Sequence, residues 1–249
     1  MALESGPWLD ENVSCIRATV ERATASDFFQ ERKRRNVAGP PPVFSREFFW
    51  YVLTGCLLTT QQKSTPGQPV DRFMHKEPFP LALPLMQPGN VATLVLSEIR
   101  QFGGIRFGPT IANRAEANFQ VLSCGGWLAA ETNFQILLEQ RKRTPAAPDR
   151  AAERAAARWA VETLEGLGPK QSRNLWQWLG LTRYEIPLDS RVAAWANKNL
   201  DSRMKIDPKE LGVPARYESV LDRVQALCGA AGVLPCLLDA AAFVEGGSG

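Results

Sequence analysis

The sequence predicts an all-α fold. Apolar residues recur at helical spacing along most of the 249 residues, no run alternates as a half-buried strand does, and no repeat has a solenoid period. Apolar residues make up 45% of the chain and charged residues 22%, which excludes a disordered chain and a fibre. The longest apolar run, residues 48–58, is about half the roughly 20 residues that a membrane span requires. The acidic, weakly apolar start MALESGPWLDENV is unlike a secretory signal, so a cytoplasmic location is expected.

The first 44 residues are expected to form an N-terminal arm or linker with one helix. The basic run Arg32-Lys33-Arg34-Arg35 fits a solvated helix face or a phosphate contact, and Gly39-Pro40-Pro41-Pro42 then forbids regular helix. Residues 45–245 are expected to form one domain of two helical lobes, and residues 246–249 a flexible tail.

The helices of this domain can be placed in order. Ser45 is a good N-cap for a buried helix that becomes polar at Thr59–Gln62, before Pro66 and Pro69. A Pro-rich segment at 77–90, a turn at 103–109 and a second Pro-rich break at 143–149 separate the next helices. These helices are expected at about 90–102, 110–122, 127–142 and 149–164.

A glycine-rich turn follows the last of these helices. It reads Leu164-Glu165-Gly166-Leu167-Gly168-Pro169-Lys170 and leads into an amphipathic helix at about 170–179. Two glycines allow a tight hairpin whose backbone can approach another molecule closely. Amide groups there and at the following helix N-terminus could bind a DNA phosphate, although many helical hairpins use glycine for the turn alone.

A second segment, Ile186-Pro187-Leu188-Asp189-Ser190-Arg191-Val192, places Asp189 19 residues after Lys170. Together the two segments resemble the helix–hairpin–helix DNA glycosylase superfamily, which has a hairpin L-x-G-h-G-x-K followed at this distance by h-x-h-D-[TSV]-[HR]-[VI]. The lysine places the resemblance with the bifunctional branch, nearest to the compact prokaryotic 8-oxoguanine DNA glycosylase/AP lyases. The matching residues are Leu164, Gly166, Leu167, Gly168, Lys170, Asp189, Arg191 and Val192.

The resemblance implies two helical lobes around a DNA-binding cleft, with Lys170 and Asp189 as catalytic residues. The Lys170 amine would attack C1′ of a flipped nucleotide and form a Schiff base that undergoes β-elimination, while Asp189 stabilises the charge that develops on the sugar. A position in the first turn of a helix, partly desolvated, favours the neutral amine that this attack needs. Alternatively, Lys170 could be a phosphate-binding lysine and Asp189 a plain N-cap.

Weaker matches suggest further site residues. Arg191 would grip a phosphate, or else be an ordinary surface residue, and Gly166 and Gly168 would contact the DNA backbone. The segment Leu57-Leu58-Thr59-Thr60-Gln61-Gln62 is similar to a family segment whose glutamine wedges into the base stack; either Gln61 or Gln62 could do this, or both could be ordinary helix-end residues. Phe243, four residues after Asp239, would stack on the extruded base, or lie in the core. Trp176 and Trp178 are further pocket candidates that face different ways.

Charge and cysteine content complete the expectations. The net charge is +3, but residues 166–205 hold seven basic and three acidic residues and so carry +4, which indicates a local DNA-binding surface. Five scattered cysteines and a single histidine offer no ligand set for a metal or an iron–sulfur cluster, so no cofactor is expected; a monovalent ion at the hairpin is allowed.

The sequence thus predicts a bifunctional DNA glycosylase/AP lyase of base excision repair, which would remove an oxidised purine such as 8-oxoguanine. Its partner would be double-stranded DNA with a damaged base, bound by a nucleoid-associated monomer with no membrane attachment. Two alternatives remain open: a monofunctional glycosylase for another modified base, and a non-catalytic helix–hairpin–helix protein that binds damaged DNA.

Overall fold

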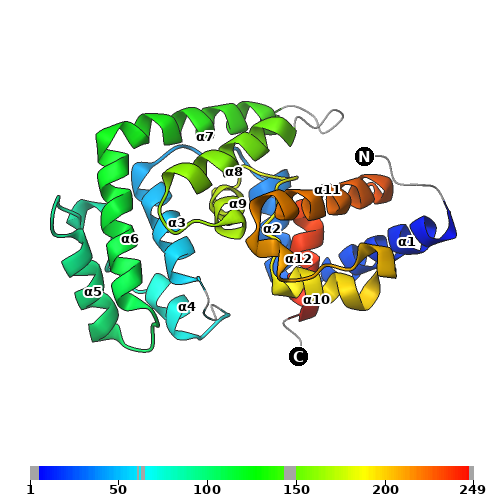
Figure 1. Ribbon diagram of the computed structural model, residues 1–249, viewed down its shortest axis with the longest axis horizontal. Helices are drawn as coiled ribbons and strands as arrows, with labels where there is room; N and C mark the ends of the chain where they lie inside the picture. The colour runs from blue at the N-terminus through cyan, green and yellow to red at the C-terminus, as the bar shows by residue number, and fades with distance from the viewer. Residues whose placement is uncertain (1–5, 61, 63–64, 143–149, 247–249) are drawn as a thin grey trace. The chain divides into compact units, whose positions relative to one another are not determined.

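The computed structural model describes residues 6–60, 62, 65–142 and 150–246, which form helices joined by turns (Figure 1). No β-strand occurs among these residues, so the predicted all-α class is confirmed. The chain divides into two compact units. Unit 1 comprises residues 1–42, 137–157 and 168–249, and unit 2 comprises residues 43–136 and 158–167.

Unit 2 contains the predicted buried helix. Its helices are α3 (Arg46–Leu58), α4 (Pro69–Met74), α5 (Val91–Phe102), α6 (Gly108–Val121), the first part of α7 (Trp127–Lys142) and the end of α8 (Arg150–Thr163). The N-cap prediction is confirmed, because Ser45 Oγ accepts a hydrogen bond from the amide of Phe48. α3 ends at Leu58 rather than Gln62, where the hydroxyls of Thr59 and Thr60 both donate to the carbonyl of Cys56. α5 and α6 lie side by side (Figure 1).

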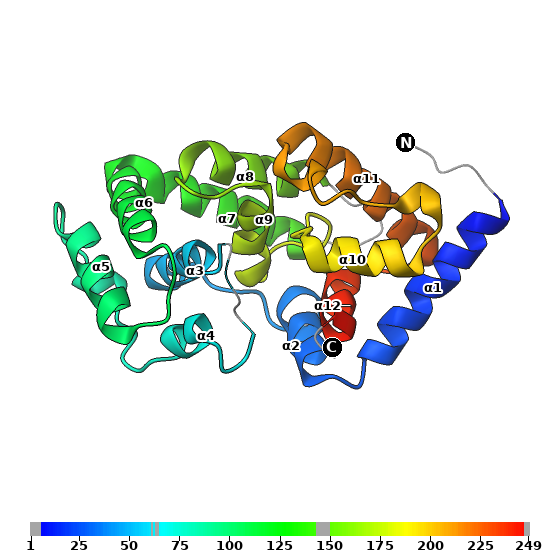
Figure 2. The same ribbon diagram turned by 60° about the horizontal axis from the view of Figure 1, so that its bottom comes forward.

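Unit 1 surrounds the last helix of the chain. Its complete helices are α1 (Pro7–Ala23), α2 (Asp27–Lys33), α9 (Pro169–Trp178), α10 (Ser190–Asn199), α11 (Pro214–Ala231) and α12 (Pro235–Gly246). α12 packs against α1, α2, α10 and α11 (Figure 2). The core beneath α10 and α11 includes Ile186, Leu188, Tyr217 and Leu221, each no more than 1% exposed.

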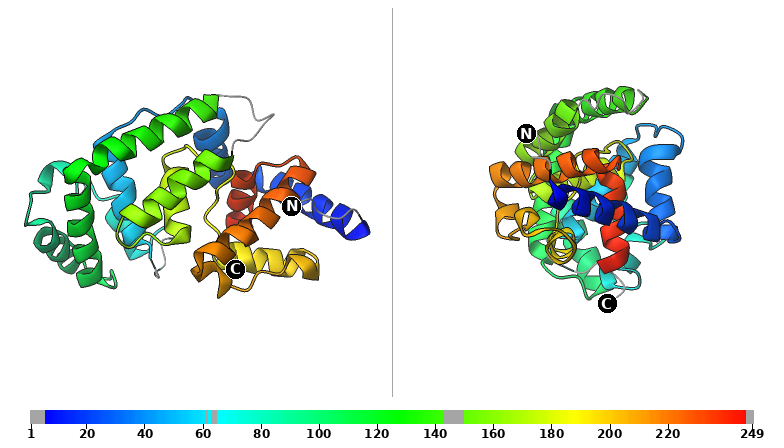
Figure 3. Two further views of the ribbon diagram at one scale, coloured as in Figure 1. Left: turned by 45° about the horizontal axis from the view of Figure 1, so that its top comes forward. Right: turned by 90° about the vertical axis from the view of Figure 1, so that its right-hand side faces the viewer.

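The N-terminal segment differs from the expected arm. α1 and α2 pack against the C-terminal helices of unit 1 (Figure 3), and they bury Ile16, Ala23 and Phe29 almost completely. Gly39–Pro42 has no regular structure, as predicted, but the residues before it belong to a folded helical unit. The physical reason is the apolar face of α1, whose partners lie about 200 residues later in the sequence.

Helix lengths and composition give one further observation. No single helix of the described chain is long and apolar enough to cross a bilayer. By length and composition alone, α11 and α12 taken together could do so, but the chain bends by 99° between them.

Candidate active site

The glycine-rich turn between α8 and α9 is held by the buried side chain of Asn118. Asn118 Oδ1 accepts from the amide of Glu165 at 2.7 Å, and Nδ2 donates to the Glu165 carbonyl at 3.0 Å. Gly166 follows with a φ of +83°, and a Cβ there would lie 2.4 Å from Arg114 Cδ. The positive φ therefore favours glycine at 166, and a side chain there would also have to displace the flexible end of Arg114.

The second part of the turn begins α9. Gly168 is the N-cap and Pro169 the first helical residue, so Lys170 lies in the first turn of the helix as the sequence predicts. Gly168 has an ordinary φ of −80°, and no heavy atom lies within 4 Å of where its Cβ would be. The second glycine is thus free of any folding requirement that the described residues reveal.

The side chains of Lys170 and Asp189 form an ion pair within unit 1. Lys170 Nζ lies 3.3 Å from Asp189 Oδ2, with the two side chains 35% and 12% exposed. Asp189 is also the N-cap of α10, because its Oδ1 accepts from the amides of Arg191 at 2.9 Å and Val192 at 3.2 Å. The N-cap prediction is confirmed, and because the cap uses Oδ1, Oδ2 is left for the ion pair with Lys170.

The electrostatics keep Asp189 ionised. Burial alone would raise the pKa of this carboxyl, but a hydrogen bond from Arg191 and the positive charge of Lys170 outweigh burial and lower it. Arg191 contributes two contacts to Oδ2, from Nε at 3.0 Å and Nη2 at 2.6 Å. The carboxylate therefore stays ionised beside the amine and can stabilise a cation that forms at the same place.

Asp239, which the sequence does not indicate as a site residue, lies close enough to Asp189 for their charges to interact. Burial raises the pKa of Asp239 on α12 to about 6; the charge of Arg32 opposes that shift, the charge of Asp189 adds to it, and a hydrogen bond with Gln177 opposes it. Arg32 Nη1 in turn donates to Gln177 Oε1 at 3.3 Å. In the sequence, Asp239 is marked only as the acidic residue four positions before Phe243 and Arg32 only as part of the basic run 32–35, and nothing local marks Gln177.

Phe243 belongs to the same neighbourhood. The Arg191 guanidinium lies 4.4 Å from the centre of its ring, and the ring stacks on Phe28 of α2 with centroids 4.3 Å apart and an interplanar angle of 15°. Phe243 is only partly buried. The structure thus brings together Lys170, Asp189, Arg191 and Phe243, with Phe28 and Asp239 as unpredicted neighbours.

The other predicted residues are placed differently. Gln61 lies outside the described residues. Gln62 Oε1 accepts from the amide of Arg106 at 2.9 Å, so its amide group binds a neighbouring turn of unit 2. Trp176 is completely buried and its indole N–H donates to the Ala156 carbonyl at 2.9 Å, which makes it a core residue and not the wall of an open pocket. Trp178 is partly buried.

The predicted basic surface of residues 166–205 also needs correction. Arg173 is 2% exposed and forms an ion pair with the fully buried Glu185. Arg183 donates to the backbone carbonyls of Asn36 and Arg141. Two of the seven basic residues therefore stabilise unit 1, because a buried guanidinium needs partners inside the protein.

No group of three or more His, Cys, Asp or Glu side chains that could hold a metal ion is found in the described part of the chain. The comparisons with known proteins give no neighbour: no family model matches the sequence, and no curated protein or solved structure matches it either. What the site can do therefore has to be argued from its own chemistry. It combines an amine, an ionised carboxylate, two guanidinium groups and a stacked aromatic pair.

Proposed function

We propose that the protein is a bifunctional DNA glycosylase/AP lyase of base excision repair, acting on an oxidised purine with 8-oxoguanine as the first candidate. One observation carries the proposal: the amine of Lys170, just after the glycine-rich turn, lies 3.3 Å from Asp189 Oδ2. A protein that only binds DNA gains no grip on phosphates by pairing its lysine with a carboxylate. An amine that forms a cationic imine during the reaction does benefit from an ionised carboxylate at this distance.

The reaction follows from these groups. The Lys170 ammonium first loses its proton to water, and the neutral amine then attacks C1′ of the flipped nucleotide, while the ionised Asp189 carboxylate stabilises the positive charge that develops on the sugar. The bond between C1′ and the base nitrogen breaks, and the base leaves as it gains a proton. The sugar ring opens to give a protonated imine on Lys170. Loss of a C2′ proton then breaks the C3′–O3′ bond, which cleaves the strand on the 3′ side.

Binding of double-stranded DNA would use the turn and the aromatic pair. The amides around Gly168 and the start of α9 are suited to a phosphate, and Arg191, 41% exposed, can reach another. Phe243 is stacked between Phe28 and the Arg191 guanidinium, so an extruded base would reach its ring by displacing Arg191, with Asp239 and Gln177 as nearby polar groups. We propose that the protein binds DNA as a monomer. No step of the proposed reaction requires a cofactor.

The test is borohydride trapping on duplex DNA with a single 8-oxoguanine. We expect the wild type to give a covalent protein–DNA adduct and a cleaved strand, and Lys170→Gln to give neither. Lys209→Gln, which removes an exposed lysine of unit 1 outside residues 166–205, is the matched control and should retain adduct formation. An adduct of undiminished yield with Lys170→Gln would exclude the proposed nucleophile.

The same assay separates the alternative functions. Release of free base without strand cleavage would indicate a monofunctional glycosylase, and damage-selective binding without base release would indicate a non-catalytic protein. A panel of duplexes with oxidised, alkylated and hypermodified bases identifies the substrate.

A further inference from the structure

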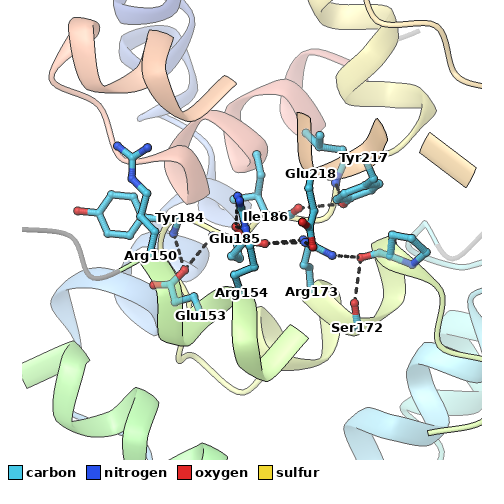
Figure 4. A network of polar contacts seen from close by, with 12 residues as sticks. Arg150, Glu153, Arg154, Ser172, Arg173, Tyr184, Glu185, Ile186, Tyr217 and Glu218 are labelled. Carbon is cyan, nitrogen blue, oxygen red and sulfur yellow. Dashed lines mark hydrogen bonds and ion pairs between the residues drawn. The ribbon is translucent and has the colours of Figure 1, made fainter. Parts of the chain in front are cut away.

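We infer that Arg173, Glu185 and Tyr217 form a buried clamp that sets the position of Lys170 relative to Asp189 (Figure 4). These are positioning residues, because none of them is one of the reacting groups. The inference rests on the proposed function. It adds that three buried residues outside the sequence motif fix the position of the Lys170 amine relative to the Asp189 carboxylate.

Arg173 links the start of α9 to the segment that leads to Asp189. Its Nη1 donates to the Pro169 carbonyl at 3.0 Å, directly before Lys170 in the chain. Its Nε donates to Glu185 Oε2 at 2.8 Å, and Nη2 lies 2.7 Å from the same oxygen. One rigid guanidinium thus spans from the residue before the amine to the segment four residues before the carboxylate.

Glu185 is fixed from several directions. Its other oxygen, Oε1, accepts from Arg154 Nε at 3.0 Å and Nη2 at 2.9 Å, and from Gln225 Nε2 at 3.1 Å. Its backbone amide donates to Glu153 Oε2 at 2.8 Å. Glu185 is completely buried, so any movement would leave a charged group unpaired in the interior.

Tyr217 holds the last residues before Asp189. Its hydroxyl accepts from the amide of Leu188 and donates to the carbonyl of Ile186 at 3.0 Å. Burial raises the pKa of this phenol, so the hydroxyl keeps the proton that the Ile186 carbonyl needs. The Arg173 guanidinium lies 4.6 Å from the centre of the Tyr217 ring, which joins this contact to the ion pair.

The clamp is a poor device for stability alone. Replacing a buried ion pair with apolar side chains of similar volume is often neutral or stabilising, because both charges lose their hydration on burial. Its arrangement instead fits a positional role, since all three side chains bind backbone or neighbours next to the reacting pair. A displacement of about 1 Å can slow an enzymatic step on the order of 100-fold.

The first experiment compares Tyr217→Phe with Tyr51→Phe. Each variant loses one phenol hydroxyl that donates to a backbone carbonyl, and the Tyr51 hydroxyl donates to Met74 in unit 2 at 3.2 Å. We measure the single-turnover rate of adduct formation at saturating DNA, the Kd for DNA, and the folded fraction at the assay temperature. We expect Tyr217→Phe to slow adduct formation at least tenfold, with Kd within about twofold of wild type and the protein folded, and Tyr51→Phe to match the wild type.

The second experiment removes both charges of the Arg173–Glu185 ion pair together, so that neither residue keeps a charge without its partner. Arg173→Met combined with Glu185→Leu should fold with a Tm near that of the wild type and still form the adduct at least tenfold more slowly. A wild-type rate in this double variant, or a Tyr217→Phe rate equal to that of Tyr51→Phe, overturns the clamp and leaves the proposed function intact. A wild type that forms no adduct overturns the proposed function, and the clamp falls with it.

Discussion

Asp189 performs two tasks with its two oxygens, and substitution can separate them. Oδ1 caps α10 and Oδ2 binds the Lys170 ammonium. Asparagine is as good an N-cap as aspartate, whereas alanine is not. We expect Asp189→Asn to change the free energy of unfolding by less than about 1 kcal/mol, and Asp189→Ala to cost about 1 kcal/mol more.

Both substitutions should slow adduct formation on the order of 100-fold, because both remove the carboxylate that stabilises the developing positive charge. Urea unfolding measures the effect of losing the N-cap hydrogen bonds on stability. Borohydride trapping measures the effect of losing the negative charge on the rate of adduct formation. If Asp189→Asn traps DNA at the wild-type rate, the carboxylate is a cap only.

Asp239 makes the stability of the fold depend on pH. Its pKa is about 6 in the folded protein and near its ordinary value of 3.8 in the unfolded chain, so the folded state holds a proton that the unfolded state has lost. The stabilisation is complete below pH 4 and is lost as the pH rises through 6. Urea unfolding should show Asp239→Asn gaining on the order of 2 kcal/mol over the wild type between pH 4 and pH 7.

A matched control for this titration is Asp10→Asn, which removes an exposed carboxyl from α1. Asp10→Asn should not reproduce the pH-dependent gain of Asp239→Asn, because the Asp10 side chain is exposed on α1. Glu153, whose pKa burial raises to about 7, titrates in both proteins and cancels in the comparison. A flat difference for Asp239→Asn would show that the Asp239 carboxyl titrates in the folded protein as it does in the unfolded chain.

At the residue scale, the sequence predicts Lys170 and Asp189 together but not their surroundings. The two residues follow from the resemblance to helix–hairpin–helix DNA glycosylases, and the structure places their side chains in contact. Asp239 and Arg32 approach the pair from α12 and α2, and no local pattern encodes such distant neighbours. Arg173 looks from the sequence like a DNA-binding cation, because its buried partner Glu185 becomes visible only in three dimensions.

At the scale of the elements, the two glycines of the turn have different duties. Gly166 has a positive φ that side-chain-bearing residues rarely adopt, so Gly166→Ala should destabilise the protein by about 1–2 kcal/mol. Gly168 has an ordinary φ and open space where a Cβ would be, so Gly168→Ala should leave the free energy of unfolding within about 0.5 kcal/mol.

Under the proposed function, Gly168→Ala should nevertheless weaken DNA binding, since the added methyl group obstructs a close approach of the backbone to a phosphate. Thermal unfolding and fluorescence anisotropy with duplex DNA measure the two effects separately. Unchanged affinity of Gly168→Ala would mean that the turn serves the fold and does not touch DNA.

Helix boundaries show where local chemistry suffices. The Ser45 cap and the starts of α9 and α10 are encoded by the residues at those ends, and the structure agrees with all three. The N-terminal segment shows the opposite case. Its proline-rich end suggests a linker, but Ile16 and Phe29 find apolar partners in the C-terminal half of the sequence and become core residues.

At the scale of the whole molecule, fewer basic side chains of residues 166–205 are available to contact DNA under the proposed function than the sequence suggests. Residues 166–205 carry a net +4, yet Arg173 is buried and Arg183 binds backbone carbonyls. Lys198 is exposed on α10, seven residues after Arg191, and two helical turns place both on one face. Affinity for DNA should therefore depend on the exposed cations and not on the total count.

The dependence of Kd on salt tests this distribution. Each phosphate contact that is lost should reduce the slope of log Kd against log salt concentration by about 0.9. We expect Lys198→Gln to show this reduction with a free energy of unfolding within about 0.5 kcal/mol of wild type. Arg183→Gln should keep the wild-type slope and instead lose about 1–3 kcal/mol of stability, because the carbonyls that it binds lose their donor. Equal reductions of the slope in the two variants would mean that Arg183 reaches DNA, and the division between structural and DNA-facing cations would then be wrong.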